Sequence, residues 1–318
     1  MARIYAVLLM FATAVLCSTA YASCGSTFCT INTGETALGP WVKPGWRFDL
    51  HAEYIDQDTL RSGTKKVDPS GEPDEHDEIR TINRNLVALV DYSWTETWGV
   101  SVLLPWVNRY HKHIFNDPIE GPEPEKWDFS ELGDMRVVGR YQFPNQPDSD
   151  HFVGLRFGLK LPTGSTDVTN SEGELAERSL QPGTGTTDVV LGAYYSTPFG
   201  PDRTSWFVEA GVVAPLDSHD NFKPGTHTTF NVGLNYAFAE KVSASLQLNL
   251  SHKGRDSGAE AEPEDSGSDQ AFISPGLSVE IGRTARLYGF VQFPIYQDVN
   301  GTQLTADRAY AFGWAQVF

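Results

Sequence analysis

Long apolar runs are scarce in this sequence. A helical membrane bundle needs several apolar stretches of roughly 20 residues, and a mean hydropathy of −0.32 excludes one. Basic residues are also scarce, with Lys+Arg 24 against Asp+Glu 41 and a net charge of −17. Because the phosphate backbone needs a basic partner surface, we expect no nucleic-acid partner.

Cysteine is rare as well, at three residues. Two of them, Cys24 and Cys29, lie beyond the N-terminal signal peptide that is described below. In an oxidising compartment, a disulfide between them is the default prediction. No histidine lies near the pair and the sequence has no Cys-x-x-Cys-His motif, so we expect neither a metal nor a cofactor there. Contact with a periplasmic redox partner is an alternative role for the pair, and lipidation of Cys24 is another.

The first residues have the pattern of a signal peptide. Arg3 supplies a positive charge, residues 4–16 form an apolar stretch, and Ala20-Tyr21-Ala22 is a small-x-small cleavage site. We predict cleavage after Ala22. The chain then divides into a signal peptide, a periplasmic N-terminal segment and an outer-membrane β-barrel, at residues 1–22, 23–45 and 46–318.

Beyond Pro44 the sequence alternates with a period of two. In 46–54 every even residue is apolar and every odd residue is charged or His, which places the two sets on opposite faces of a strand. The same alternation recurs in 98–107, 153–162, 229–238 and 242–251. Each run is about the 9–11 residues that a tilted strand needs to cross a bilayer.

Counting such runs predicts an all-β fold, an antiparallel up-and-down transmembrane barrel of about 12 strands. The connections alternate between long ones, expected outside the cell, and short periplasmic turns, as in bacterial outer-membrane barrels. The long ones are 57–78, 114–126, 164–185, 217–226 and 254–269, and 298–305 is the last connection. No second domain and no long helix is expected. The predicted location is the outer membrane of a Gram-negative bacterium.

Acidic residues gather in the long connections. Six acids and no Lys or Arg lie in 68–78, and six acids accompany Arg255 in 254–269. Bridging by divalent cations to lipopolysaccharide and repulsion of anions at the mouth are two functional interpretations, and a solvated, disordered loop is the alternative. At the C-terminus, Phe318 with aromatic residues at alternate upstream positions resembles the signal that the barrel-insertion machinery reads. We therefore expect outer-membrane lipid, lipopolysaccharide and that machinery as partners.

Charged and aromatic side chains alternate onto the inward face and form the predicted solute path. They could line an open pore or fill a packed interior, because a barrel of about 12 strands lies between filled small barrels and open porins. Other aromatics expected to point inward are Tyr194, Phe207, Phe272 and Tyr296. The lumen set is Arg47, Asp49, Glu53, Arg109, Asp134, Arg136, Arg140, Arg156, Lys160, Glu209, Tyr288 and Phe290.

Several short stretches resemble a known family. Leu132-Gly133-Asp134, 161–165, 181–188 and 297–304 are similar to motifs of outer-membrane transporters linked to the meta-cleavage pathway of phenol degradation. The resemblance spans the chain from about Trp46 to Phe318. It implies a barrel that passes hydrophobic or aromatic compounds and brings no catalytic residues with it.

The function expected from the sequence is therefore passage of small, hydrophobic or aromatic solutes, without enzyme activity. A lipid-modifying outer-membrane hydrolase is the main alternative, since Ser218-His219-Asp220-Asn221 holds residue types of a catalytic triad. Neighbours in one loop seldom form a triad, because its members must converge in space. A structural barrel that holds a periplasmic redox partner through Cys24 and Cys29 is a second alternative.

Overall fold

The computed structural model describes residue 33 and residues 44–70, 76–144 and 151–318. In this part of the chain, no helix is long and apolar enough to cross a membrane. The predicted signal peptide and the Cys24–Cys29 disulfide lie outside the described residues and stay predictions.

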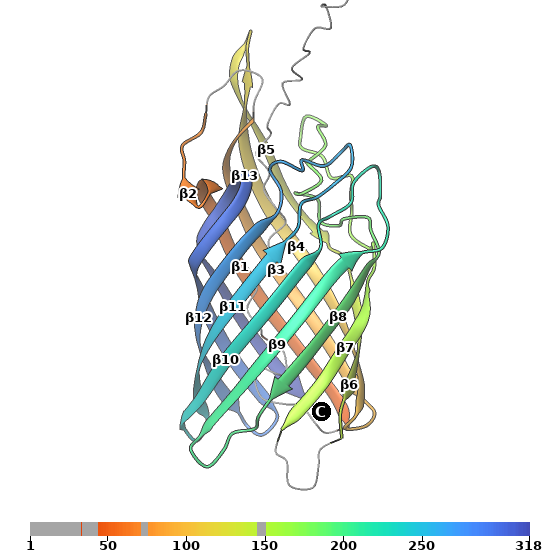
Figure 1. Ribbon diagram of the computed structural model, residues 1–318, viewed down its shortest axis with the longest axis vertical. Helices are drawn as coiled ribbons and strands as arrows, with labels where there is room; N and C mark the ends of the chain where they lie inside the picture. The colour runs from red at the N-terminus through yellow and green to blue at the C-terminus, as the bar shows by residue number, and fades with distance from the viewer. Residues whose placement is uncertain (1–32, 34–43, 71–75, 145–150) are drawn as a thin grey trace, which may run out of the picture.

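The described chain forms a closed antiparallel barrel (Figure 1). Eleven strands follow one another around the ring, and β13 pairs with β1 to close it. Two further strands, β2 and β5, pair only with the upper parts of β1 and β4. The strands are β1 Gly45–Gly63, β2 Lys65–Lys66, β3 His76–Ser93, β4 Trp98–Asp117, β5 Gly121–Leu132, β6 Arg136–Gln142, β7 Phe152–Lys160, β8 Asp188–Ser196, β9 Thr204–Pro215, β10 His227–Ala239, β11 Val242–Lys253, β12 Ser268–Ile281 and β13 Ala285–Val317.

The long strand β13 spans the barrel wall twice, once in each direction. Residues 285–299 pair with β12, and residues 299–317 pair with β1. The chain reverses at Gly301, whose φ of 56° lies in the left-handed region that glycine tolerates. Eleven ring strands with β13 counted twice give twelve crossings, so the predicted barrel of about 12 strands is confirmed.

The outer face carries the apolar half of each alternating strand. Along β1, Trp46 and Tyr54 are exposed while Arg47, Asp49 and Glu53 between them are buried. An uncovered apolar surface of this extent is one that lipid covers. We call it the apolar band. Its exposed members include Leu86, Leu104, Trp106, Leu155, Phe157, Leu234, Leu246, Leu248, Leu277 and Phe293.

Aromatic pairs mark the periplasmic edge of the apolar band. The ring centroids of Trp46 and Tyr92 lie 4.5 Å apart, and those of Trp98 and Tyr141 lie 4.8 Å apart. Such girdles suit the polar–apolar boundary of a bilayer. Toward the extracellular end of the barrel, the side chains that face away from the lumen become polar, beginning at Asp56 on β1, Arg84 on β3 and Asn108 on β4. The parts of these strands beyond them stand outside the membrane.

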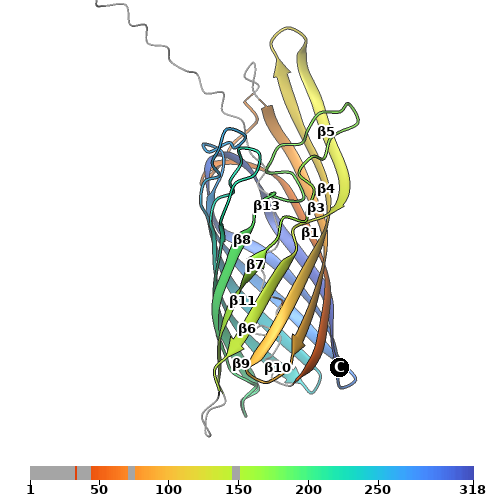
Figure 2. The same cartoon turned by 90° about the vertical axis from the view of Figure 1, so that its right-hand side faces the viewer.

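The connection predicted at 114–126 is mostly strand, which corrects the sequence interpretation. β4 and β5 continue as a hairpin that projects beyond the barrel (Figure 2). Its turn closes tightly because the Asp117 carboxylate accepts hydrogen bonds from the backbone N–H groups of Ile119 at 2.7 Å and Glu120 at 2.6 Å. Pro122 and Pro124 lie in β5, whose only partner strand among the described residues is β4. Proline suits such an edge because it offers no N–H for further pairing.

Tyr296 was predicted to face inward and instead lies on the outer surface, 48% exposed. The pairing of β12 with β13 shifts between Ala271, opposite Tyr296, and Phe272, opposite Pro294. A bulge of this kind moves the following side chains to the other face, so strict alternation fails there. Similarly, 298–305 forms the reversal within β13 and extends its strands.

Candidate functional site: the lumen and the loop over its mouth

All twelve side chains assigned to the lumen lie on the inner side of the barrel, and most of them are buried. At the periplasmic end Asp49 is the centre of a polar network. Its carboxylate accepts a hydrogen bond from the Tyr288 hydroxyl at 2.8 Å, and the His51 Nδ1 lies 3.0 Å away. The Arg47 guanidinium lies 3.6 Å from Asp49 and 3.6 Å from Asp91. These groups neutralise one another across β1, β3 and β13.

Four basic residues form two cross-strand pairs on the inner wall of β6 and β7. Arg136 lies opposite Lys160, and Arg140 lies opposite Arg156. Arg140 donates a hydrogen bond to the Ser93 hydroxyl at 2.6 Å. Like charges directly opposite are unfavourable, so this wall needs carboxylates close by.

The next strands supply those carboxylates. Arg156 lies 2.6 Å from Glu209 on β9, and Lys160 lies 2.9 Å from Asp188 and 3.2 Å from Asp134. Arg156 and Lys160 are therefore paired with carboxylates on the inner wall. Asp188 was not among the residues predicted to face the lumen, although it ends the family-like stretch 181–188 and begins β8.

Four inward aromatic rings each lie over a glycine of the neighbouring strand. A Cβ added at any of these glycines would come within 2.1–2.4 Å of a ring atom. Glycine therefore lets each ring lie along the wall, which is the arrangement called aromatic rescue of glycine. The pairs are Tyr194 over Gly154, Phe207 over Gly233, Phe290 over Gly276 and Tyr288 over Gly313. All four rings belong to the periplasmic half of their strands.

Asp134 connects three of the family-like stretches through hydrogen bonds. It lies in the short break between β5 and β6, and one carboxylate oxygen accepts the N–H of Gly164 at 3.0 Å. Its other oxygen accepts the N–H and the hydroxyl of Thr184 at 2.9 and 3.0 Å. Gly164 and Gly183 touch so closely that a Cβ on Gly164 would lie 2.8 Å from the Cα of Gly183. The stretches 132–134, 161–165 and 181–188 thus form one contact region on the inner wall.

This contact region fixes the loop 161–187 across the outer mouth. Leu180 at its inner side is completely buried, in a cluster with Leu60, Trp127, Ala176 and Leu304. The Arg109 guanidinium donates to the Leu180 carbonyl oxygen at 2.5 Å. Arg109 therefore holds the loop in place from the barrel wall.

The fourth family-like stretch, 297–304, holds the neighbouring outer loop. The Thr302 N–H donates to the Asp265 carboxylate at 2.7 Å, and the Asn300 amide donates to the Ser266 carbonyl oxygen at 2.9 Å. Asp256 accepts the N–H of Gly225 at 2.7 Å. Some acids of the predicted solvated loop 254–269 are thus buried and hydrogen-bonded.

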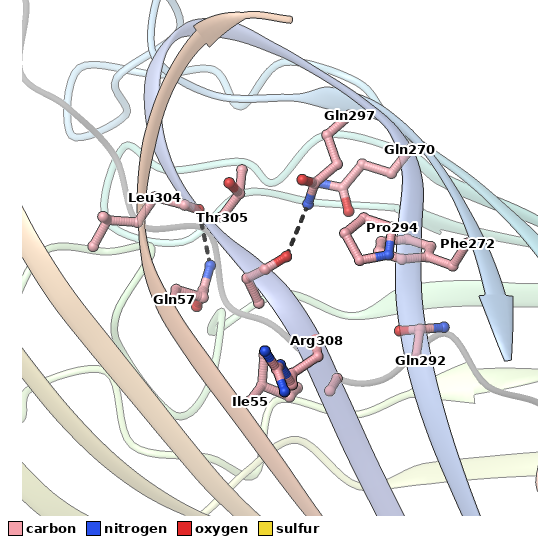
Figure 3. A pocket seen from close by; sticks show the side chains of 12 residues that line it. Ile55, Gln57, Gln270, Phe272, Gln292, Pro294, Gln297, Leu304, Thr305 and Arg308 are labelled. Carbon is pink, nitrogen blue, oxygen red and sulfur yellow. Dashed lines mark hydrogen bonds between the residues drawn. The ribbon is translucent and has the colours of Figure 1, made fainter. Parts of the chain in front are cut away.

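A cavity of about 60 Å³ lies inside the wall where β1, β12 and β13 meet (Figure 3). Gln57 donates across it to the Leu304 carbonyl oxygen at 3.0 Å, and Gln297 donates to that of Ala306 at 3.3 Å. A second cavity near the periplasmic end has about 10 Å³.

The triad-like residues at 218–221 form a turn. Asp220 and Asn221 have positive φ values of 46° and 56°, which these residue types tolerate. His219 and Phe222 exchange backbone hydrogen bonds at 2.9 Å around them. The residue types therefore reflect a tight reversal in an outer loop.

The family model described as "Putative MetA-pathway of phenol degradation" matches residues 81–312, which are 232 of the 318 residues. The chain belongs to this family. The match contains all four of the stretches that form the contact region and the β13 reversal.

Several solved structures of outer-membrane channels and transporters are similar to this phenol-degradation family member. The COG4313 outer membrane channel from Pseudomonas putida F1 is 14% identical, with 91% of this chain and 100% of that chain covered and a TM-score of 0.68. The CymD monoaromatic hydrocarbon channel is 9% identical over 87% and 89% of the chains, with a TM-score of 0.46. The Ralstonia pickettii toluene transporter TbuX is 10% identical over 86% and 90%, with a TM-score of 0.45.

No curated protein matches the sequence at a significant level. The first of the structural matches shows that the chain has the fold of an outer-membrane channel. Together with the apolar band, this fold places the family member in the outer membrane of a Gram-negative bacterium. The predicted fold class and location are both confirmed.

Proposed function

We propose that this protein is a passive outer-membrane channel for small apolar or aromatic solutes. The proposal depends on the four aromatic rings that lie over glycines, Tyr194, Phe207, Tyr288 and Phe290. All four rings are buried in the described state, with at most 4% of each exposed, so a solute reaches their apolar area when the lumen side chains around them move. The family description, which refers to phenol degradation, supports the same solute class.

The proposed path begins under the loop 161–187. In the described state this loop covers the mouth, so a solute enters when the loop moves away from the wall. Apolar area that a solute buries contributes about 25 cal/mol per Å², which favours rings over the charged network for an aromatic solute. The paired charges reject free ions, because an ion there would have to separate partners such as Arg156 and Glu209.

Further proposed partners lie at the two rims. Phe318 is exposed at the periplasmic rim, where its N–H donates to the Trp46 carbonyl oxygen at 2.9 Å. This leaves its ring accessible to the barrel-insertion machinery during assembly. At the outer rim, exposed acids such as Asp128 and Glu131 on β5 suit divalent-cation bridges to lipopolysaccharide.

The test is uptake by whole cells of a Gram-negative host that lacks its own general porins. We expect the protein to raise the initial uptake rate of labelled toluene or phenol several-fold over cells with an unrelated barrel. Glycerol, a polar solute of comparable size, should gain little. Equal rates for toluene, phenol and glycerol, or no gain for any of them, would exclude the proposed function.

A further inference from the structure

Three adjacent strands bring histidine and carboxylate groups together inside the outer mouth. In the strand register His113 on β4 lies opposite Glu78 on β3 and opposite Glu125 on β5. His111 is two positions along the same inner face, and His76 begins β3. All five residues lie closer to the extracellular end than Arg84 and Asn108, where the apolar band ends. They are therefore outside the membrane.

Three ligand-type atoms converge at one point in this cluster. The His113 Nε2 lies 2.6 Å from the Glu125 Oε2 and 3.2 Å from the His76 Nδ1, and all three atoms lie within 4.8 Å of one another. The His113 Nε2 carries at most one hydrogen, so it cannot donate at full strength to both neighbours. A single cation between the three atoms would interact with all of them.

The spacing fits a small transition-metal ion. Zinc binds imidazole nitrogen at about 2.0–2.1 Å and carboxylate oxygen at about 2.0–2.2 Å in a tetrahedron, whose ligand atoms are then about 3.3 Å apart. The separation of 3.2 Å between the His76 and His113 nitrogens is close to this value. The 2.6 Å contact to Glu125 would have to open by less than 1 Å, which a carboxylate rotation provides.

The imidazoles are in the charge state that a metal needs. Burial lowers the pKa of His113 to about 4 and also lowers the pKa of His76. Both rings are therefore neutral at neutral pH and can offer a lone pair to a metal.

Outer contacts orient the ring of His113. Its Nδ1 lies 3.3 Å from the His111 Nε2, and the His111 Nδ1 lies 2.9 Å from the Thr81 hydroxyl. The Trp127 ring packs edge-on against His113 at a centroid distance of 4.9 Å. Hydrogen-bonded partners behind a ligating histidine are typical of metal sites, where they fix the ring orientation.

We propose that His76, His113 and Glu125 form a binding site for one divalent transition-metal ion of the class that imidazole prefers, such as Zn²⁺. The neighbouring group of Glu78, His111 and His113 shares a ligand but is buried on every member. His76 and Glu125 are half-buried, so an ion can reach them from the mouth. The ion would tie β3 and β5 to β4 at the rim, with a remaining position open to water.

The test uses the full mature protein, refolded in detergent without a polyhistidine tag and titrated calorimetrically with Zn²⁺ at neutral pH. We expect one saturable ion per chain. His76→Ala, His113→Ala and Glu125→Gln should each weaken binding at least 100-fold. His111→Ala, which removes only the group behind His113, should weaken it by about 10–100-fold. Co²⁺ should give the visible absorption of a low-symmetry site, and His76→Ala should abolish it.

Matched controls separate this site from the alternatives. His252 and Asp269 make a contact of the same 2.6 Å length on the exposed surface, so His252→Ala should leave Zn²⁺ binding unchanged. Glu78→Gln tests the buried group, and Cys24→Ser with Cys29→Ser tests thiolate binding; all should bind like the wild type. Heat-modifiability on gels shows that each variant is folded. Absence of saturable binding, loss with Glu78→Gln but not His76→Ala, or loss with the cysteine changes would overturn the proposal.

Discussion

Replacing Gly233 by alanine tests whether the aromatic rings depend on their glycine seats. Gly233 on β10 lies directly opposite Phe207 on β9. The added Cβ would lie 2.1 Å from one ring carbon and 2.4 Å from the next. Because carbon atoms in contact prefer about 3.5–4.0 Å, the Phe207 ring must retreat by about 1.5 Å.

Two responses are open to the ring, and each has its own readout. If the ring stays near the wall, overpacking of this kind costs about 1–3 kcal/mol of the free energy of unfolding. If it swings toward the barrel axis, the stability loss is smaller and the lumen narrows. We expect Gly233→Ala to lower stability in urea titrations by about that amount, or to lower the uptake of toluene severalfold, or to do both in part.

A double-mutant cycle assigns the effect to the ring. In a Phe207→Ala background the added methyl meets no ring, so Gly233→Ala should cost little there, and the cycle should show a coupling of about 1–3 kcal/mol. Gly289→Ala is the matched control, since its Cβ would lie 3.6 Å from the Phe312 ring, an ordinary contact. Wild-type stability and uptake in Gly233→Ala, with no coupling to Phe207, would refute the reasoning.

Three other outcomes are expected. Asp134→Asn replaces one hydrogen-bond-accepting oxygen by an amide N–H, at a place where N–H and O–H donors point at it. At about 1–2 kcal/mol per disrupted contact, the change should lower the free energy of unfolding by about 2–4 kcal/mol and expose the loop 161–187 to protease. Unchanged protection would contradict this role of Asp134. Arg156→Glu should destabilise by about 1–3 kcal/mol, since the pair is partly exposed, and Glu209→Arg should restore stability in the double variant; additive losses would argue against pairing. An epitope inserted after Ile119 should label intact cells, and one after Glu240 should label only lysed cells; the reverse pattern would invert the topology.

Much of the barrel could be predicted because its signal is local. Alternation along 242–251 separates Leu246, Leu248 and Leu250 from Gln247 and Asn249, and the structure places the first set outside and the second inside. No long-range information is needed for this, because successive side chains of any strand point to opposite faces. The even number of crossings follows from the same local count.

The hairpin of β4 and β5 shows where a local signal misleads. Gly, Pro and Glu in 121–125 have low strand propensity, so the sequence favours a loop there. The strand forms because β4 offers a complete row of pairing partners from Asp117 to Trp106. Tyr296 fails for the opposite reason, since the bulge that turns it outward depends on the partner strand.

By itself, the sequence determined the strands, their apolar face, the inward position of the charged residues and the family resemblance. Only the tertiary structure decided how these inward groups are used. It brings Asp134 within hydrogen-bonding distance of Thr184, 50 residues away, and places the Phe207 ring over Gly233. It also brought His76 within 3.2 Å of His113. The physical reason is that facing outward depends on the local period of a strand, whereas contacts across a lumen depend on register, bulges and closure of the whole barrel.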